Sequence, residues 1–269
     1  MPGSQPLPID VALTPSAAVV APGRVVIVID QIRASTTITT ALDLGCSELL
    51  LAGDVETARR LARGTGRLLA GEQQAVKPAD FDLDNSPVEL TRADLRGRGM
   101  ILCTTNGTAV VSRLRHADHL LIGCLRNAQA VAEAAVRLAG ASGAGSTGST
   151  DDAGDSVATG GGVQVVCAGR NGRFVIDDAV AAGVIVEQLL EAAAAAGREA
   201  RPTDAASAAV RLRRSFPSLL AAMTESDGGT TLVEIGAPED IAFCAEEDLS
   251  RTVPALVPGE DLRIVALSG

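Results

Sequence analysis

The fold is indicated most strongly by the stretch Val25-Val26-Ile27-Val28-Ile29-Asp30-Gln31-Ile32-Arg33-Ala34-Ser35-Thr36-Thr37-Ile38-Thr39-Thr40. Its first five residues are apolar and β-branched, which predicts a strand buried on both faces, as in the centre of a parallel sheet. The strand ends at an acid, Asp30, and an arginine and several hydroxyl residues follow where a helix is expected to start. Ser35 or Thr36 is the expected N-cap of that helix.

Asp30 lies where a metal and a phosphate could both bind. A carboxylate at the carboxyl end of a buried strand lies beside the free amide groups of the next helix, and such amides favour anions. An isolated Asp would more simply end the strand and cap the turn. The full run Asp30-x-x-Arg33-x-Ser35-Thr36-Thr37 favours a functional site over that simpler interpretation.

The composition excludes several classes of protein. The chain has 269 residues, of which 46% are hydrophobic, and its mean hydropathy of +0.24 predicts a sizeable core. It contains four Phe and no Trp or Tyr, so it lacks the aromatic surfaces on which single-stranded nucleic acids stack. A net charge of −10 also argues against a nucleic-acid or anionic membrane partner. An anionic substrate would therefore need local arginines or a bridging cation.

The sequence favours a reduced, cytoplasmic protein. We expect no signal peptide and no membrane span, because no apolar run is long enough for either. The cysteines are odd in number and scattered, and no pair has the spacing of a zinc site. They are Cys46, Cys103, Cys124, Cys167 and Cys244. Whether the chain forms a homodimer is left open by the sequence.

Strand and helix patterns alternate along the rest of the chain. Apolar runs predict strands at 48–52, 67–70, 100–103, 118–122 and 163–167, with helical patterns between them. This alternation predicts an α/β fold with layered α/β/α architecture and a largely parallel or mixed sheet. Residues 140–162 are nearly all Gly, Ser, Thr, Ala and Asp, and we expect a flexible insertion there within a single domain spanning 1–269.

Two further segments place polar residues after predicted strands. Glu72 follows the strand at 67–70, although a solvated loop Glu would fit equally well. Thr104-Thr105-Asn106-Gly107-Thr108 follows the strand at 100–103 and opens a helix, as the hydroxyl run after Asp30 does. Two such helix starts favour a phosphate site. The stretch 80–89 is also acidic, but Ser86, Pro87 and Glu89 fit a helix capping box, so we assign it to structure first and to a metal site second.

Taken together, these motifs resemble the 2-phosphosulfolactate phosphatase, or ComB, family. The resemblance covers nearly the whole chain in order, apart from 140–162. The matching blocks are Asp30-x-x-Arg33-Ala34-Ser35-Thr36-Thr37, Gly71-Glu72, Phe81-Asp82-Leu83-x-Asn85-Ser86-Pro87-x-Glu89, Thr104 to Thr108, Gly123-x-x-x-Asn127, Cys167-Ala168-Gly169, Asp177-Asp178-x-x-Ala181-x-Gly183, and Asp240-Ile241 to Val253-Pro254. Three positions depart from the family pattern: Gln31 replaces an aliphatic residue, Gln73 replaces Arg, and Asp84 replaces Gly.

The resemblance implies a Mg²⁺-dependent acid phosphatase with an α/β fold distinct from the haloacid dehalogenase fold. Its implied substrate is a small phosphorylated sulfonate, 2-phosphosulfolactate, which is converted to sulfolactate and phosphate within coenzyme M synthesis. On this basis Asp30, Arg33 and Glu72 are the candidate catalytic residues, with Asp30 and Glu72 as metal ligands. The candidate substrate-binding residues are Ser35, Thr36, Thr37, Thr104, Thr105, Asn106, Gly107 and Thr108. Asp30 could instead attack phosphorus itself.

Two alternatives compete with this assignment. Cys167 and Arg173 are separated by five residues after a predicted strand, which is the layout of thiol-dependent phosphatases. No His precedes Cys167 and no Ser or Thr follows Arg173, which argues against that class. The other alternative is a non-catalytic protein that binds a phosphorylated metabolite with the same anion sites.

Overall fold

The computed structural model describes residues 6–142 and 161–267. Its strands are β1 (Leu7–Ala12), β2 (Arg24–Ile29), β3 (Glu48–Ala52), β4 (Leu68–Gly71), β5 (Gly99–Cys103), β6 (His119–Ile122), β7 (Gly162–Cys167), β8 (Ala200–Pro202), β9 (Pro254–Val257) and β10 (Arg263–Ala266). Within the described residues they form one ten-stranded sheet in the order β4-β5-β3-β10-β9-β6-β2-β7-β1-β8. Most neighbours are parallel, and the antiparallel hairpin of β9 and β10 joins β6 to β3. The predicted mixed sheet is confirmed.

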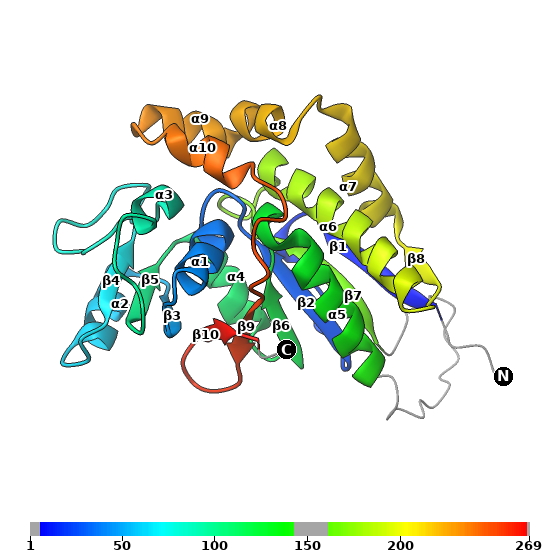
Figure 1. Ribbon diagram of the computed structural model, residues 1–269, viewed down its shortest axis with the longest axis horizontal. Helices are drawn as coiled ribbons and strands as arrows, with labels where there is room; N and C mark the ends of the chain where they lie inside the picture. Colours follow the sequence, from blue (N-terminus) through cyan, green and yellow to red (C-terminus); the bar gives the residue numbers. More distant parts are fainter. Residues whose placement is uncertain (1–5, 143–160, 268–269) are drawn as a thin grey trace.

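Helices cover both faces of this sheet (Figure 1). They are α1 (Ala34–Asp43), α2 (Val55–Ala62), α3 (Pro87–Leu90), α4 (Asn106–Leu114), α5 (Ala128–Ser142), α6 (Ile176–Ala195), α7 (Asp204–Ser215), α8 (Leu219–Glu225), α9 (Asp227–Glu234) and α10 (Glu239–Cys244). Val25, Ile27 and Ile29 of β2 pack in the cluster that includes α5 and α6, whereas Val26 and Val28 pack in the cluster with α1 and α4. Every residue of β2 is buried, which confirms the central strand and the layered α/β/α architecture.

Helix α1 begins earlier than the sequence predicts. Its N-cap is Arg33, which makes no side-chain cap, and Ser35 and Thr36 lie inside the first turn. Their hydroxyls turn back to the loop: Ser35 Oγ accepts a hydrogen bond from the amide of Asp30, and Thr36 Oγ1 donates to the carbonyl of Gln31. The predicted N-cap is therefore wrong, because these hydroxyls hydrogen-bond to the end of the strand rather than to the helix amides.

Two other local predictions change in detail. Ser86 caps α3 by accepting from the amide of Glu89, with Pro87 in the first position, as predicted. The Glu89 carboxylate, however, accepts from the amide of Asp84 rather than from that of Ser86, so only half of the capping box forms. At the predicted insertion, α5 extends to Ser142 and β7 begins at Gly162. Residues 143–160 of that predicted insertion lie outside the described residues.

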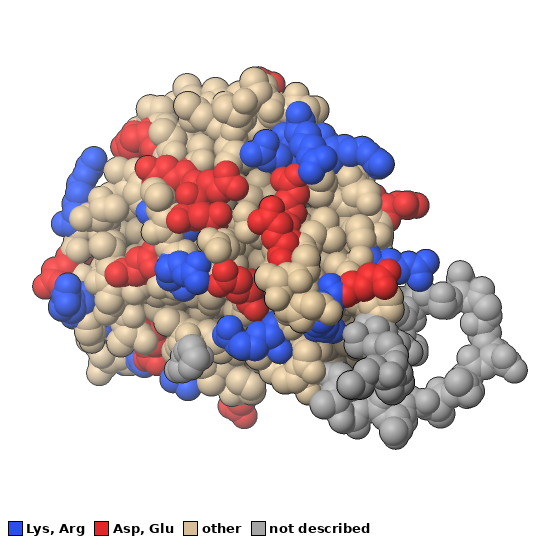
Figure 2. Space-filling model, turned by 45° about the vertical axis from the view of Figure 1, so that its right-hand side comes forward, with Lys and Arg blue, Asp and Glu red and all other residues tan. Residues whose placement is uncertain are grey.

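The short helices α8, α9 and α10 lie together at one end of the molecule, at the top of Figure 1. In the described residues, no helix is long and apolar enough to cross a membrane. The face drawn in Figure 2 carries several separate groups of Lys and Arg side chains, with Asp and Glu side chains between them.

Candidate active site

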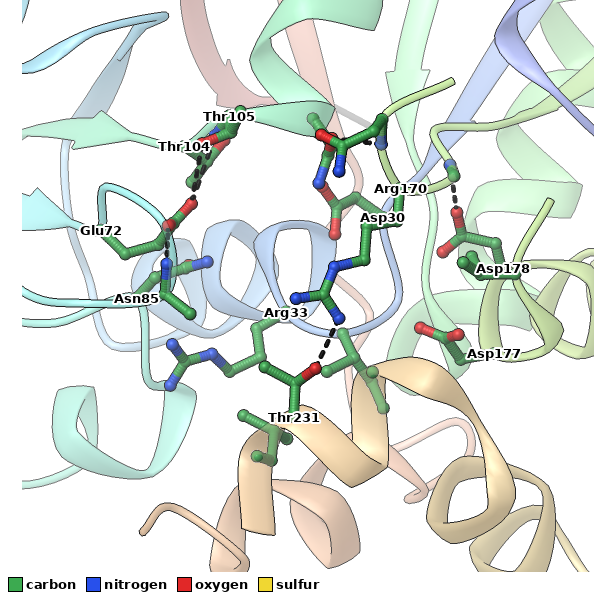
Figure 3. Close-up of a pocket in the computed structure, with 18 of the residues that line it drawn as sticks. Asp30, Arg33, Glu72, Asn85, Thr104, Thr105, Arg170, Asp177, Asp178 and Thr231 are labelled. Carbon is green, nitrogen blue, oxygen red and sulfur yellow. Dashed lines mark hydrogen bonds between the residues drawn. The ribbon is translucent and has the colours of Figure 1, made fainter. Parts of the chain in front are cut away.

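A pocket of about 400 Å³ lies where the loops after β2, β4, β5 and β7 meet the start of α6 and helix α9 (Figure 3). The carboxyl ends of parallel strands share one edge of a sheet, which is where ligands bind in α/β folds. The sheet therefore brings together Asp30, Glu72 and Asp177, which are far apart in the sequence. Helix α9 supplies Gly228, Thr231 and Leu232 to the opposite wall, and its C-cap residue Ile235 lies beside them.

Asp30 follows β2 and accepts hydrogen bonds from the amides of Ala34 in α1 and Gly107 in α4. Burial raises the pKa of Asp30 to about 6, and the nearby charge of Glu72 adds to this rise, while the two amides oppose it. A Cβ atom at position 107 would lie 2.8 Å from Asp30 Oδ2, so a glycine is required for this close approach. The starts of both predicted anion-binding helices thus converge on the Asp30 carboxylate.

Asp177 and Asp178 form the first turn of α6 and line the same pocket. Asp178 accepts from the amide of Gln31 at 2.8 Å and from that of Gly169 at 2.7 Å, so it joins the loops after β2 and β7. Asp177 Oδ1 is buried and has no hydrogen-bond partner among the described residues. Burial raises the pKa of Asp177 to about 7, and the charge of Asp30 contributes.

In the sequence these two acids are part of a family motif and had no predicted role of their own. An acid pair in the first turn of a long helix after a buried strand was the signal available. Like Asp30, these acids lie near the start of a helix that follows a buried strand.

Glu72 follows β4 and lies on the other side of the pocket from Asp177 (Figure 3). Its Oε1 accepts from the amide and the hydroxyl of Thr105, both at 3.3 Å, and its Oε2 accepts from the amide of Ala75 at 2.6 Å. Glu72 and Asp30 do line one pocket. Within residues 6–142 and 161–267, however, no group of three or more His, Cys, Asp or Glu side chains is arranged to hold a metal ion.

Arg33 lines the pocket but is engaged by two carboxylates. Its Nη1 donates to Asp240 at 2.8 Å and to Asp84 at 3.3 Å, and its side chain is only 4% exposed. Asp240 is fully buried and also accepts from the hydroxyl of Ser86. Arg33 therefore ties the loop after β2 to α3 and α10, and the family departure at Asp84 supplies part of that link.

The eight predicted substrate-binding residues fall into three groups. Thr104, Thr105 and Asn106 line the main pocket. Ser35, Gly107 and Thr108 lie behind Asp30 around a much smaller adjoining cavity. Thr36 and Thr37 are buried outside both cavities, and the Thr37 hydroxyl donates to the carbonyl of Asn85. The structure thus brings Thr104 to Asn106 to the main pocket, whereas Ser35, Thr36 and Thr37 are buried and do not line it.

Arg170, which lies between Cys167 and Arg173 and had no predicted role, also lines the pocket. Cys167 itself does not: it is fully buried in β7, and burial raises the pKa of its thiol well above the ordinary value. Arg173 is exposed and lies outside the pocket. The structure therefore argues against the thiol-dependent alternative, because the thiol is buried in the strand and does not line the pocket.

This architecture, an acidic pocket with helix amides at the carboxyl edge of a mainly parallel sheet, defines an α/β protein with an enzyme-like site. A profile of the family described as 2-phosphosulpholactate phosphatase matches residues 12–259. The chain therefore belongs to the 2-phosphosulfolactate phosphatase family, as predicted. The predicted enzyme class, a phosphoric monoester hydrolase, is confirmed with it.

Individual relatives agree over almost their full length. A protein of Deinococcus radiodurans is 36% identical over 245 residues, which cover 90% of this chain and 92% of that protein. One of Thermus thermophilus is 36% identical over 233 residues (86% and 87%), and one of Thermotoga maritima is 33% identical over 255 residues (93% and 96%). Each is named "Probable 2-phosphosulfolactate phosphatase".

Proposed function

We propose that this protein is a Mg²⁺-dependent phosphatase that hydrolyses a small phosphorylated acid, with 2-phosphosulfolactate as the substrate and sulfolactate and phosphate as products. One observation carries the proposal: Asp30, held by amides from two helices, shares a pocket with the buried and unpartnered oxygen of Asp177. This substrate is the one for which the family and its relatives are named. The family resemblance supports a place in coenzyme M synthesis, and the free, scattered cysteines support a cytoplasmic location.

The donor set of the pocket fits Mg²⁺. Asp30 and Asp177 are both acids. Burial raises the pKa of each carboxyl, and the charge of Asp30 raises the pKa of Asp177 further. Magnesium in proteins is commonly held by one or two carboxylates, with water and substrate phosphate completing its shell, so a cluster of three acids is not required. Asp30 and Asp177 would hold the ion. Glu72, whose oxygens already accept hydrogen bonds, would act through water.

When bound, Mg²⁺ would supply positive charge to the phosphoryl oxygens and compensate the acids of the pocket. Arg33 would add to this from beside Asp30. Only its Nη1 has a hydrogen-bond partner among the described residues, which leaves the other N–H groups for the phosphoryl oxygens. The hydroxyl and amide of Thr105 and the side chain of Asn106 line the wall opposite. Asp30 acts either as a ligand or as the attacking group.

The test is phosphate release from 2-phosphosulfolactate by the full chain, with Mg²⁺ and with excess chelator. We expect turnover that needs Mg²⁺ and is restored when the ion is added back. Equal phosphate release in the presence of the chelator would remove Mg²⁺ from the proposal, and no release under either condition would remove the substrate. The non-catalytic alternative predicts binding of the phosphorylated acid without release.

A further inference from the structure

Two arginines line the pocket, and they differ in how their charge is compensated. Arg33 is paired with Asp84 and Asp240. Arg170 forms no ion pair with any carboxylate in the described parts of the chain. Its Nη1 donates instead to two neutral acceptors of α9, the hydroxyl of Thr231 at 2.5 Å and the carbonyl of Asp227 at 3.4 Å. Arg170 is therefore the pocket arginine whose positive charge is left for a ligand.

The backbone that carries Arg170 is fixed from three sides. Arg170 and Arg173 exchange both of their backbone hydrogen bonds, which closes a tight turn. The turn needs glycine at position 169, where φ is +62° and a Cβ atom would lie 2.1 Å from the carbonyl oxygen of Arg173. The amide of Gly169 donates to Asp178, and the amide of Asn171 donates to the side chain of Asn106. The loop thus holds Arg170 in place against the acids and the hydroxyl segment.

The side chain of Arg170 crosses the pocket. Figure 3 shows it running from the loop after β7 toward Thr231 of α9, with Glu72 and Thr105 on one side and Asp177 and Asp178 on the other. The guanidinium is therefore held away from the sheet edge, by acceptors that orient it without neutralising it. A planar, oriented guanidinium with spare donors suits two-pronged binding of a carboxylate or a sulfonate.

We propose that Arg170 binds the acidic group of the substrate that is not hydrolysed, its carboxylate or sulfonate, and so selects small phosphorylated acids over other phosphate esters. This inference rests on the proposed function, in which the phosphoryl group is handled beside Asp30 at the sheet edge. A pocket of about 400 Å³ has room for a small organic acid as well as a phosphoryl group. Thr231 holds the guanidinium in position through Nη1 and leaves its other N–H groups for the acid.

The test uses sulfolactate, which carries both acidic groups and no phosphate. Its dissociation constant is measured by calorimetry on the full chain, on Arg170→Gln and on Arg173→Gln, which removes an exposed arginine of the same loop. We expect Arg173→Gln to match the wild type and Arg170→Gln to bind at least about 30-fold more weakly, the loss typical of a charge-assisted hydrogen-bonded pair. Titration with lactate and with 2-hydroxyethanesulfonate then shows whether carboxylate or sulfonate loses more affinity.

Binding of sulfolactate to Arg170→Gln within threefold of the wild type would overturn the assignment, and so would an absence of binding to the wild type. If Arg170→Gln does not fold, Arg170→Lys keeps a charge without the two-pronged geometry, and we expect it to bind about fivefold or more weakly. Unchanged affinity in Arg170→Lys would then count against the proposal. Because sulfolactate has no phosphate ester, this result is independent of turnover, whereas failure of phosphate release in the wild type counts against the proposed function alone.

Discussion

Replacing Gly107 by alanine should disable the site while leaving the fold nearly intact. The new Cβ atom would lie 2.8 Å from Asp30 Oδ2 and 3.3 Å from the Cβ atoms of Asp30 and Ala34. An ordinary carbon–oxygen contact is about 0.6 Å longer than 2.8 Å, so the Asp30 carboxylate must rotate or α4 must shift. The same methyl would also crowd the hydrogen bond that the backbone amide of residue 107 donates to Asp30.

The two consequences differ in size. Overpacking of this kind costs about 1–3 kcal/mol in folding free energy, and alanine returns up to about 1 kcal/mol within a helix, so the net loss of stability should be about 0–2 kcal/mol. A catalytic carboxylate displaced by more than half an ångström should lower kcat/KM by about 10- to 100-fold. Melting temperature and phosphate release from 2-phosphosulfolactate are measured on the same preparations.

Gly140→Ala is the matched control. Gly140 also lies within a helix, α5, but a Cβ atom there would meet only Arg198 Nη1, at 3.5 Å. We expect wild-type activity and equal or slightly higher stability from this control. A Gly107→Ala protein with wild-type kcat/KM would refute the view that close packing against α4 sets the position of Asp30.

Three further outcomes follow from the same geometry. The pKa values of Asp30 and Asp177 are raised from 3.8 to about 6 and about 7, so the native protein binds protons more tightly than the unfolded chain. The free energy of unfolding of the metal-free protein should therefore fall as pH rises from about 4 to about 7. Mg²⁺ should raise the melting temperature more at pH 7.5 than at pH 5. Arg33→Ala should lower stability by about 3–5 kcal/mol in denaturant titration, because it leaves the fully buried Asp240 without its ion-pair partner; a loss below about 1 kcal/mol would show that the pair is not structural. Cys167→Ser should keep most of its phosphate release, since the thiol is buried away from the pocket; an inactive but folded variant would revive the thiol mechanism.

The elements that position Asp30 could be predicted because their signals are local. An unbroken run of β-branched residues predicts a strand buried on both faces, and an acid directly after it falls at the ligand-binding edge of a parallel sheet. Glu72 and Thr104 to Asn106 follow strands in the same way, and all of them line the pocket. For these residues, position along the chain and position in the site are tied together by the alternation of strands and helices.

Other features depend on contacts between distant segments and could not be predicted. The hydroxyls of Ser35 and Thr36 looked like helix caps, but the backbone of the preceding loop competes for them. Arg33 was predicted only as a catalytic residue, and the folded chain adds its ion pair with the buried Asp240. The role proposed for Arg170 depends on its having no ion-pair partner among the described residues, which no local sequence pattern expresses.

The central claim is that Asp30, with Mg²⁺, removes phosphate from 2-phosphosulfolactate. The most direct measurement compares Mg²⁺-dependent phosphate release from this ester by the wild type and by Asp30→Asn, which keeps the size of the side chain and removes its charge. We expect turnover by the wild type and a loss of at least about 1000-fold in the variant, with an unchanged circular dichroism spectrum. An Asp30→Asn protein that releases phosphate at a rate near that of the wild type would contradict the account.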